Sequence, residues 1–215
     1  MEVKKYFVKT PWLLKKIYAD YLWSVPGKEK ILYLSFDDGP HPEATPFVLR
    51  ELKKHNALAT FFCIGKNVIE HSEVYKQILD EGHEVGNHTH NHLNGWKVSN
   101  DIYLKNIAEA SNYIDSNLFR PPYGRITKWQ AKNLPAAMKG KKAKVVMWDV
   151  LSADFDANIS AQQCLENVIF SARPGSIIVF HDSQKCFEKL QVVLPVVLNY
   201  FSNKGYVFRS IERKL

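Results

Sequence analysis

Two adjacent carboxylates, Asp37 and Asp38, follow a short apolar run and stand directly before a Gly-Pro turn. The run, residues 31–36, is typical of a buried strand that ends abruptly. Neighbouring strand residues point in opposite directions, but the turn could aim both carboxylates at one cavity. On its own the pattern fits an ordinary strand-ending turn better than a reactive site. Whether the two carboxylates form a reactive site therefore depends on the other reactive residues of the chain.

A histidine pair supplies the second chemical signal. His88 and His92 stand four positions apart in the segment H-T-H-N-H, on one face of a helix or of a tight turn. Neutral imidazole is the commonest metal ligand, and two imidazoles with one carboxylate, from Asp38 or Asp37, leave an open position on a zinc-like ion. The alternative is a polar surface loop, and His90 is expected to lie outside the ligand set. The other histidines are expected to be ordinary surface or helix residues: His41, His55, His71 and His83.

Short apolar runs alternate with helical patterns along the chain, which predicts a parallel sheet flanked by helices. No glycine-rich phosphate loop is present, and this favours a distorted barrel over a nucleotide-binding fold. Strands are predicted over residues 31–36, 59–64, 84–86, 118–120, 144–148, 176–181 and 206–209. Helices are predicted from Thr45 as N-cap to 56, over 67–81 and 101–116, from the cap Ser160 to 172, and after Ser183 with a kink at Pro195.

The candidate polar residues all follow predicted strands. The Asp pair follows the first strand, the His pair follows the third, and Arg120 ends the fourth. Asp149 and Asp154 follow the fifth strand, and His181 ends the sixth. Parallel barrels build their active sites at the carboxyl ends of their strands. This shared position indicates one site rather than scattered structural residues.

Five short motifs occur in a fixed order: S-F-D-D-G-P from Ser35, H-T-H-N-H from His88, R-P-P-Y-G from Arg120, D-F at Asp154, and V-F-H ending at His181. They resemble the motifs T-F-D-D-G-P, H-[ST]-x-x-H, R-x-P-[YF]-G, Asp-Trp and L-x-H of the polysaccharide deacetylase family, the family 4 carbohydrate esterases that share the NodB homology domain. Serine replaces threonine in the first motif, phenylalanine replaces tryptophan in the fourth, and valine replaces leucine in the fifth.

The resemblance implies a distorted (β/α)7-type barrel over residues 31–215 as the catalytic domain, with residues 1–30 as an N-terminal extension packed on it. It also implies a metal-dependent hydrolase that removes acetyl groups from N-acetylglucosamine-containing glycans of the chitooligosaccharide or peptidoglycan type. The bond cut is an amide, but not a peptide bond. One divalent ion is expected on Asp38, His88 and His92. Zinc is the first expectation, with cobalt, nickel or manganese as alternatives.

The resemblance also assigns the base side of the reaction. Asp37 resembles the general base that takes a proton from water, and Arg120 resembles the residue that orients this base. The backbone N–H of Tyr123 resembles a donor to the developing oxyanion.

On the acid side, His181 resembles the general acid that protonates the leaving amine, and Asp154 resembles the carboxylate that keeps this imidazole charged. Asp149 lies near the end of the same predicted strand and is the alternative partner of His181. Asp182 is expected to be a carboxylate at a helix start.

Sugar binding and the type of acetyl group remain open. Tyr123, Trp148 and Phe155 are candidates for contacting the glycan, and each could instead be a packing aromatic. Two other functions stay possible: an O-acetyl esterase on a xylan-like polysaccharide, and a non-catalytic glycan-binding relic. A relic is expected to lack Asp37 or His181, and both are present.

Composition narrows the class of protein further. The chain has 215 residues, 46% of them hydrophobic, and a net charge of +7, which is typical of one globular domain. The basic residues are dispersed, so nucleic-acid binding is not expected. No apolar stretch approaches the ~20 residues of a membrane span, and no secretory signal is visible near the N-terminus. A cytoplasmic monomer is favoured unless the sequence is truncated.

The chain has three cysteines, Cys63, Cys164 and Cys186, and they imply no disulfide framework. Cys63 is expected to be buried.

Overall fold

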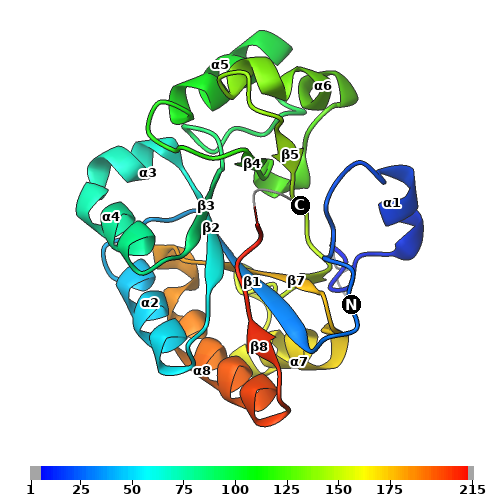
Figure 1. Ribbon diagram of the computed structural model, residues 1–215, viewed down its shortest axis with the longest axis vertical. Helices are drawn as coiled ribbons and strands as arrows, with labels where there is room; N and C mark the ends of the chain where they lie inside the picture. Colours follow the sequence, from blue (N-terminus) through cyan, green and yellow to red (C-terminus); the bar gives the residue numbers. More distant parts are fainter. Residues whose placement is uncertain (1–5, 213–215) are drawn as a thin grey trace.

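The computed structural model describes residues 6–212. A curled sheet of eight strands forms its centre, every neighbouring pair is parallel, and helices surround it (Figure 1). The strands are β1 (Ile31–Asp37), β2 (Ala59–Cys63), β3 (Glu84–Asn87), β4 (Leu118–Phe119), β5 (Lys144–Val145), β6 (Val150–Leu151), β7 (Ile177–His181) and β8 (Val207–Phe208). Their order is β5-β4-β3-β2-β1-β7-β6, and β8 pairs with the start of β1.

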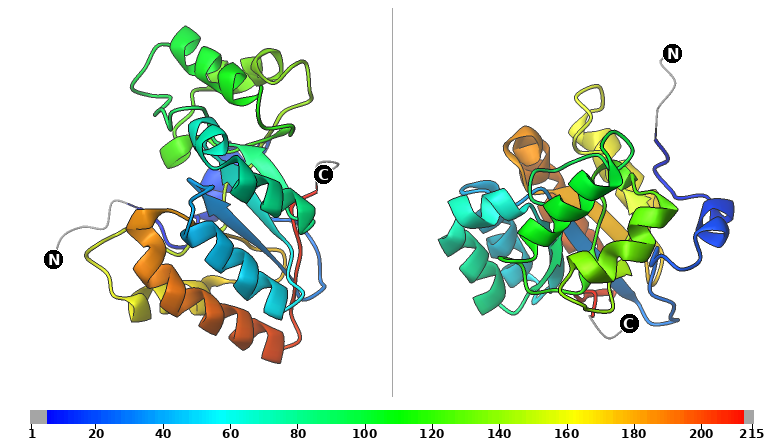
Figure 2. Two further views of the ribbon diagram at one scale, coloured as in Figure 1. Left: turned by 90° about the vertical axis from the view of Figure 1, so that its left-hand side faces the viewer. Right: turned by 90° about the horizontal axis from the view of Figure 1, so that it is seen from above.

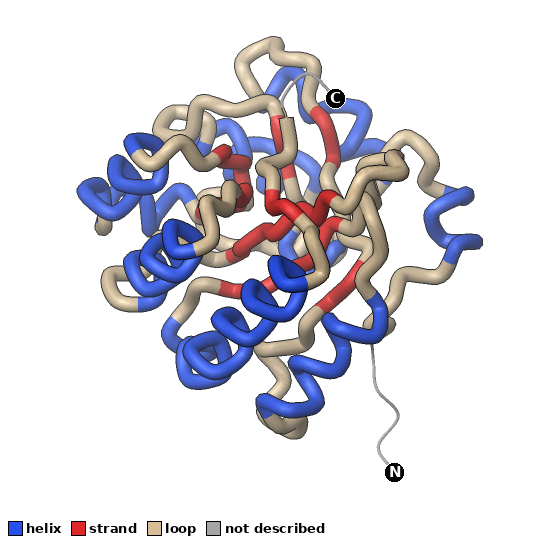
Figure 3. The backbone as a smooth tube through the Cα atoms, turned by 60° about the horizontal axis from the view of Figure 1, so that its bottom comes forward, coloured by secondary structure: helices blue, strands red, loops and turns tan. Residues whose placement is uncertain are grey.

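The helices lie outside the curled sheet, as Figures 2 and 3 show from other directions. They are α1 (Trp12–Ile17), α2 (Ala44–Lys54), α3 (Gly65–Glu70), α4 (Ser72–Asp80), α5 (Asn100–Ala110), α6 (Lys128–Ala137), α7 (Ala161–Ser171) and α8 (Phe187–Asn203). Two short 3-10 turns, η1 (Pro122–Gly124) and η2 (Gln184–Cys186), follow β4 and β7. No helix within residues 6–212 is long and apolar enough to cross a membrane.

The parallel barrel predicted from the strand and helix pattern is confirmed, and it stays open on one side. Within the described residues, the edge strands β5 and β6 do not pair with each other. Instead, the N-terminal segment bridges to both edges: Leu22 pairs with Val146 just after β5, and Lys9 pairs with Val150 of β6. The distortion of the barrel therefore lies at this opening.

The largest apolar core lies between the sheet and helices α2, α7 and α8. At its centre, the Phe36 ring stacks on Phe61 of β2 at 5.1 Å and on Phe180 of β7 at 6.1 Å. All three rings are fully buried, and burying each contributes about 1.5–3 kcal/mol. The strand ends next to these rings are therefore held firmly.

Two predicted helix starts have different outcomes. The start at Ser160 is confirmed, because its side chain accepts the N–H of Gln163 in a capping box. Thr45 as the N-cap is wrong, since α2 already begins at Ala44. The ring Nδ1 of His41 accepts the N–H of Ala44 at 3.2 Å and so takes the capping role.

The other differences concern short or interrupted elements. The predicted strand over 144–148 ends after two residues, because Met147 donates its N–H to Leu22 O (2.7 Å), and the chain then starts β6. The predicted helix over 67–81 is two helices that meet at His71. Helices α1 and α6 were not predicted. In the last helix, Pro195 lies inside α8, which begins after η2 rather than at Ser183.

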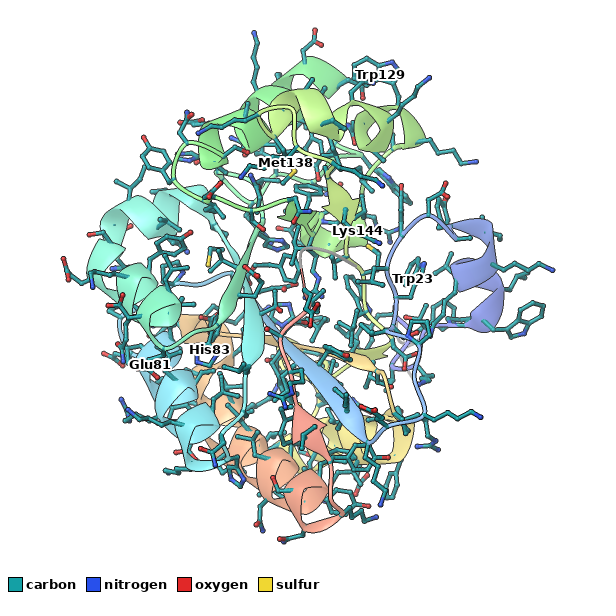
Figure 4. All side chains as sticks on the ribbon, in the orientation of Figure 1. Trp23, Glu81, His83, Trp129, Met138 and Lys144 are labelled. Atoms are coloured by element: carbon teal, nitrogen blue, oxygen red, sulfur yellow. The ribbon has the colours of Figure 1, made fainter. Side chains whose placement is uncertain are left out.

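The expectation that His83 is an ordinary surface or helix residue is also wrong. His83 lies just before β3, next to β2 in Figure 4, and it is buried. Its Nδ1 accepts the N–H of Ala59 at 3.3 Å, and its ring lies 5.5 Å from Phe61. This histidine therefore has a structural role in the core.

Candidate active site

The carboxyl ends of β1, β3, β4 and β7 meet at one edge of the sheet. Asp37 is the last residue of β1 and is the register partner of His181, the last residue of β7. His88 directly follows β3, and the N–H of Arg120 after β4 bonds to Asn87 O, the last residue of β3. The strand register therefore brings together residues that are far apart in the sequence.

Asp38, His88 and His92 form a compact group of candidate metal ligands. One ligand atom from each lies within 4.8 Å of the others. Asp38 Oδ1 is 3.1 Å from His92 Nε2 and 3.6 Å from His88 Nε2. The backbone has a positive φ at Asp38 (80°) and at His92 (55°), conformations that are uncommon without glycine. These two turns direct the side chains at each other.

The donor set fits a divalent ion such as zinc. Asp38 Oδ1 is buried and has no hydrogen-bond partner among the described residues. His88 Nδ1 lies 2.7 Å from Arg120 O, and because a carbonyl only accepts, Nδ1 must donate. This fixes the tautomer and leaves Nε2 with a free lone pair on the side of Asp38. Two imidazole nitrogens and one carboxylate match a catalytic zinc set with an open position.

Electrostatics keep Asp38 and His88 in the forms that bind a cation. Burial lowers the pKa of His88 to about 4, so its ring is neutral near pH 7. Burial opposes ionisation of Asp38, but its contact with His92 and the nearby His181 ring outweigh this effect. They hold the pKa of Asp38 well below its ordinary value.

Arg120 and Asp37 form a buried ion pair. Arg120 Nη1 donates to Asp37 Oδ1 at 2.6 Å and to Ser35 Oγ at 2.8 Å. Its other nitrogens donate to backbone carbonyls of Val146 (3.2 Å) and Met147 (3.0 Å). The side chain of Arg120 is fully buried. These bonds hold the Asp37 carboxylate in one position.

His181 and Asp154 form the second pair at the site. His181 Nδ1 lies 2.7 Å from Asp154 Oδ1, and the backbone N–H of His181 donates to Asp154 Oδ2 at 2.8 Å. Burial favours the neutral ring, but the charge and the hydrogen bond of Asp154 outweigh it and raise the pKa of His181 to about 10. The ring of Phe155 meets the His181 ring edge-on at 5.3 Å and so lies beside this pair.

Asp149, the alternative partner of His181, lies at the opposite edge of the sheet. Its N–H bonds to Ile177 O, at the start of β7 rather than its end. Its carboxylate forms ion pairs with Lys9 and Lys15 of the N-terminal segment and accepts the Ser176 hydroxyl. The placement of Asp149 among the strand-end candidates is therefore wrong, because β6 begins after this residue and not before it.

The aromatic candidates Tyr123 and Trp148 differ in exposure and in their position relative to the Asp38–His88–His92 group. Tyr123 is 62% exposed, and its ring lies 4.6 Å from His92. Trp148 is partly buried and packs against η1, the turn that contains Tyr123. A Cβ added at Gly124 of this turn would lie 2.9 Å from the Trp148 ring. Tyr123 is thus free to contact a bound molecule beside His92, whereas Trp148 supports the loop that carries Tyr123.

Asp182 was expected to be a helix-start carboxylate, and this is wrong. It is fully buried, accepts the N–H of Gly39 at 3.1 Å and accepts the Thr45 hydroxyl. Burial raises its pKa to about 8. Asp182 therefore fixes the turn that carries Asp38.

His90, which lies between the two candidate ligands His88 and His92 in the sequence, is buried and pairs with Glu109. It therefore lies outside the ligand group, as expected.

Comparisons with known proteins agree with this arrangement. The family model described as "Polysaccharide deacetylase" matches residues 24–138. A peptidoglycan-N-acetylglucosamine deacetylase of Bacillus cereus is 34% identical over 198 residues, 90% of this chain and 92% of its own length. A chitooligosaccharide deacetylase of Azorhizobium caulinodans is 35% identical over 165 residues, 74% of this chain and 76% of its own.

Among solved structures, the Bc1960 peptidoglycan N-acetylglucosamine deacetylase superposes with a TM-score of 0.82 at 32% identity, over 92% of this chain and 94% of its own. A mutant of BA3943, described as a pseudoenzyme of carbohydrate esterase family 4 with restored activity, gives 0.76 at 26% identity, over 88% and 68%. Sequence, fold and strand-end geometry together show that this chain belongs to the polysaccharide deacetylase family.

Proposed function

We propose that this protein removes the acetyl group from N-acetylglucosamine residues of a glycan by metal-assisted hydrolysis of the amide bond. The observation that carries the proposal is the meeting of three units at one sheet edge. These are the Asp38–His88–His92 group, the buried Asp37–Arg120 pair and the His181–Asp154 pair. The relatives that match over most of this chain are named for the same reaction on peptidoglycan or chitooligosaccharide.

Asp38, His88 and His92 are the residues that would hold the ion. When bound, a divalent ion supplies Lewis-acid polarisation of the acetyl oxygen and makes a water molecule more acidic. The other groups act on protons and on position, and their roles can be derived from their contacts.

Asp37 takes the proton from the attacking water as general base. Its position next to Asp38 in sequence places the base beside the metal group, and the Arg120 bond at 2.6 Å stops the carboxylate from turning toward the ion. Arg120 holds the carboxylate in place without exchanging a proton with it, because guanidinium does not deprotonate in proteins. The base and the ion thus have separate carboxylates.

His181 delivers a proton to the amide nitrogen as the C–N bond breaks. An amine leaves as a neutral molecule only if it gains this proton, and the raised pKa of His181 keeps the ring protonated near pH 7. Asp154 holds Nδ1, so Nε2 is the nitrogen that can face the substrate. Tyr123, exposed beside His92, is positioned to contact the sugar or the acetyl group.

Two alternatives are decided by the substrate panel. The retained metal group and proton-transfer pairs favour an enzyme over a non-catalytic relic, although a family pseudoenzyme shares the fold. Acetate release should be measured on chitooligosaccharides, peptidoglycan fragments and acetylated xylan, with zinc, cobalt, nickel or manganese added to the metal-free protein. Release from N-acetylglucosamine substrates supports the proposal, whereas release from xylan alone would show an O-acetyl esterase.

Matched variants separate chemistry from folding. His88→Ala should lose bound metal and activity together, whereas His71→Ala, in a histidine outside the site, should keep both. Asp37→Asn should retain the metal and lower the turnover rate by roughly 10²–10⁴. Full activity in Asp37→Asn would show that Asp37 is structural, and no acetate from any substrate with any metal would reject the proposed function.

A further inference from the structure

A third ligand atom lies beside the His181–Asp154 pair. One ligand atom each from Asp154, His181 and Cys186 lie within 4.8 Å of one another. Cys186 ends the η2 turn five residues after His181, and it is buried at 1% exposure. Among residues 6–212, only one other group of this kind exists, the Asp38–His88–His92 group. The reaction proposed above makes no use of the thiol.

We propose that Asp154, His181 and Cys186 form a second metal site, which binds a thiophilic divalent ion such as zinc or cadmium and switches the acid His181 off. The inhibitory part rests on the proposed function, because it assigns the acid role to His181. The binding part does not depend on it.

The charges of the three ligands suit a buried dication. A thiolate and a carboxylate carry two negative charges, and a neutral imidazole adds none, so the occupied site has no net charge. A neutral cluster avoids the large cost of placing an uncompensated ion in the interior. The side chain of His181 is 15% exposed and gives the ion an approach from the active-site side.

The proton balance follows from the existing contacts. The hydrogen bond between His181 Nδ1 and Asp154 Oδ1, at 2.7 Å, contains the proton that the ion replaces. Binding releases to solvent the Nδ1 proton of the charged ring, which leaves a neutral imidazole with its remaining proton on Nε2, and the thiol proton of Cys186. Burial and the charge of Asp154 raise the pKa of the Cys186 thiol, so it is protonated until a metal displaces its proton.

Occupation of this site must remove the acid. Once Nδ1 binds the ion, His181 can no longer be the charged imidazolium that Asp154 stabilises. The leaving amine then meets only the Nε2 proton of a neutral imidazole, a weaker acid than the imidazolium, even with the first metal site filled. Excess soft metal should therefore inhibit without displacing the first ion.

Ligand softness separates the two sites. The Asp38 group offers only nitrogen and oxygen, whereas the Cys186 group offers sulfur, which cadmium prefers. Cys164 is a matched control, because burial and the nearby charge of Asp154 also raise the pKa of its thiol, yet it lies outside the ligand group. Cys63 is a second control within β2.

The binding test uses full-length protein with one equivalent of zinc, titrated with cadmium. The readouts are metal content and the ultraviolet charge-transfer absorbance of a cadmium–thiolate bond. The wild type and Cys164→Ala should gain one cadmium with this absorbance, and Cys186→Ala and Cys186→Ser should not. A His88→Ala/His92→Ala variant should keep the thiolate signal. No thiolate signal in the wild type, or an equal signal in both Cys186 variants, overturns the proposal.

The activity test uses acetate release at fixed zinc. Cys186→Ala should retain the basal rate and raise the cadmium concentration for half-inhibition at least about tenfold, whereas Cys164→Ala should behave as the wild type. Equal inhibition of the wild type and Cys186→Ala would refute the switch. If the wild type releases no acetate even without cadmium, the proposed function fails, and the thiolate signal still decides whether the second site exists.

Discussion

Replacing Arg120 should cost much of the stability of the fold. Its guanidinium donates four hydrogen bonds and is fully buried. Arg120→Met keeps much of the side-chain volume but leaves the Asp37 carboxylate without a cationic partner. This carboxylate belongs to a residue that is only 4% exposed. Breaking one half of a buried ion pair costs roughly 3–5 kcal/mol. For a chain of this length, the melting temperature should fall by roughly 6–20 °C.

A double-mutant cycle isolates the ion pair from the lost packing. Asp37→Asn should destabilise the wild type, because it leaves a buried guanidinium facing a neutral amide. In the Arg120→Met background the same change removes a stranded charge and should cost little or should stabilise. The two effects of Asp37→Asn should therefore differ by at least about 1 kcal/mol.

Urea unfolding of the metal-free protein at constant pH measures all four variants without a contribution from the ion. Arg173→Met is the matched control, since Arg173 is exposed and its guanidinium bonds, within residues 6–212, only to the carbonyls of Phe170 and Ala172. It should change the unfolding free energy by no more than about 0.5 kcal/mol. If Asp37→Asn has the same effect with and without Arg120, within about 0.5 kcal/mol, the pair does not stabilise the site as argued.

Three further predictions concern the other carboxylates. Asp154→Asn should lower the pKa of His181 from about 10. NMR titration would measure this pKa, and the basic limb of the pH–rate profile should shift to lower pH. An unmoved pKa would contradict the pairing. Asp182 has a pKa of about 8, above its ordinary 3.8, so the folded state holds an extra proton between these values and stability falls as pH rises through this window. In metal-free protein, Asp182→Asn should flatten that pH dependence of urea unfolding, and an unchanged slope would exclude the effect. Asp149→Asn should leave Lys9 without its buried partner, cost roughly 1–3 kcal/mol and speed proteolysis within residues 6–22, whereas unchanged cleavage would show that the pair does not hold this segment.

The strands that carry the site were predictable because they are buried on both faces. β1, β2 and β7 are almost fully buried, and such strands appear in the sequence as continuous apolar runs bounded by turns. The polar residues that end the runs of β1 and β7 then lie at the active edge. Asp37 and His181 follow this rule directly, since they are register partners at the ends of β1 and β7.

The errors lie where strands are too short for a pattern. β5 and β6 have two residues each, so neither shows the alternation that identifies a strand. The run over 144–148 has the length of a strand, but its second half pairs with the N-terminal segment through Met147 and Leu22. This long-range pairing shifts Asp149 to the far edge, and no local signal in the sequence indicates it.

Buried polar groups at loops were also missed, because their partners are remote. Asp182 follows His181 in a stretch that resembles a helix start, yet its partners are Gly39 and Thr45, more than 130 positions earlier. His41 caps α2 with a ring nitrogen, a role that composition does not suggest for histidine. Side chains that fix loops to each other need the fold before their role can be inferred.

The adjacent carboxylates of the first motif can serve two purposes because only Asp37 belongs to β1, whereas Asp38 lies after the strand. Asp37 ends β1, and its side chain meets Arg120, a permanent cation that occupies one of its oxygens. At Asp38 the positive φ reverses the chain and turns the next carboxylate toward two imidazoles instead. One of these, His88, is held neutral by burial, so it leaves the charge of Asp38 available to an ion. Two adjacent residues thus acquire different partners, one suited to moving a proton and one suited to holding a metal, and the change of backbone direction between them is what separates the roles.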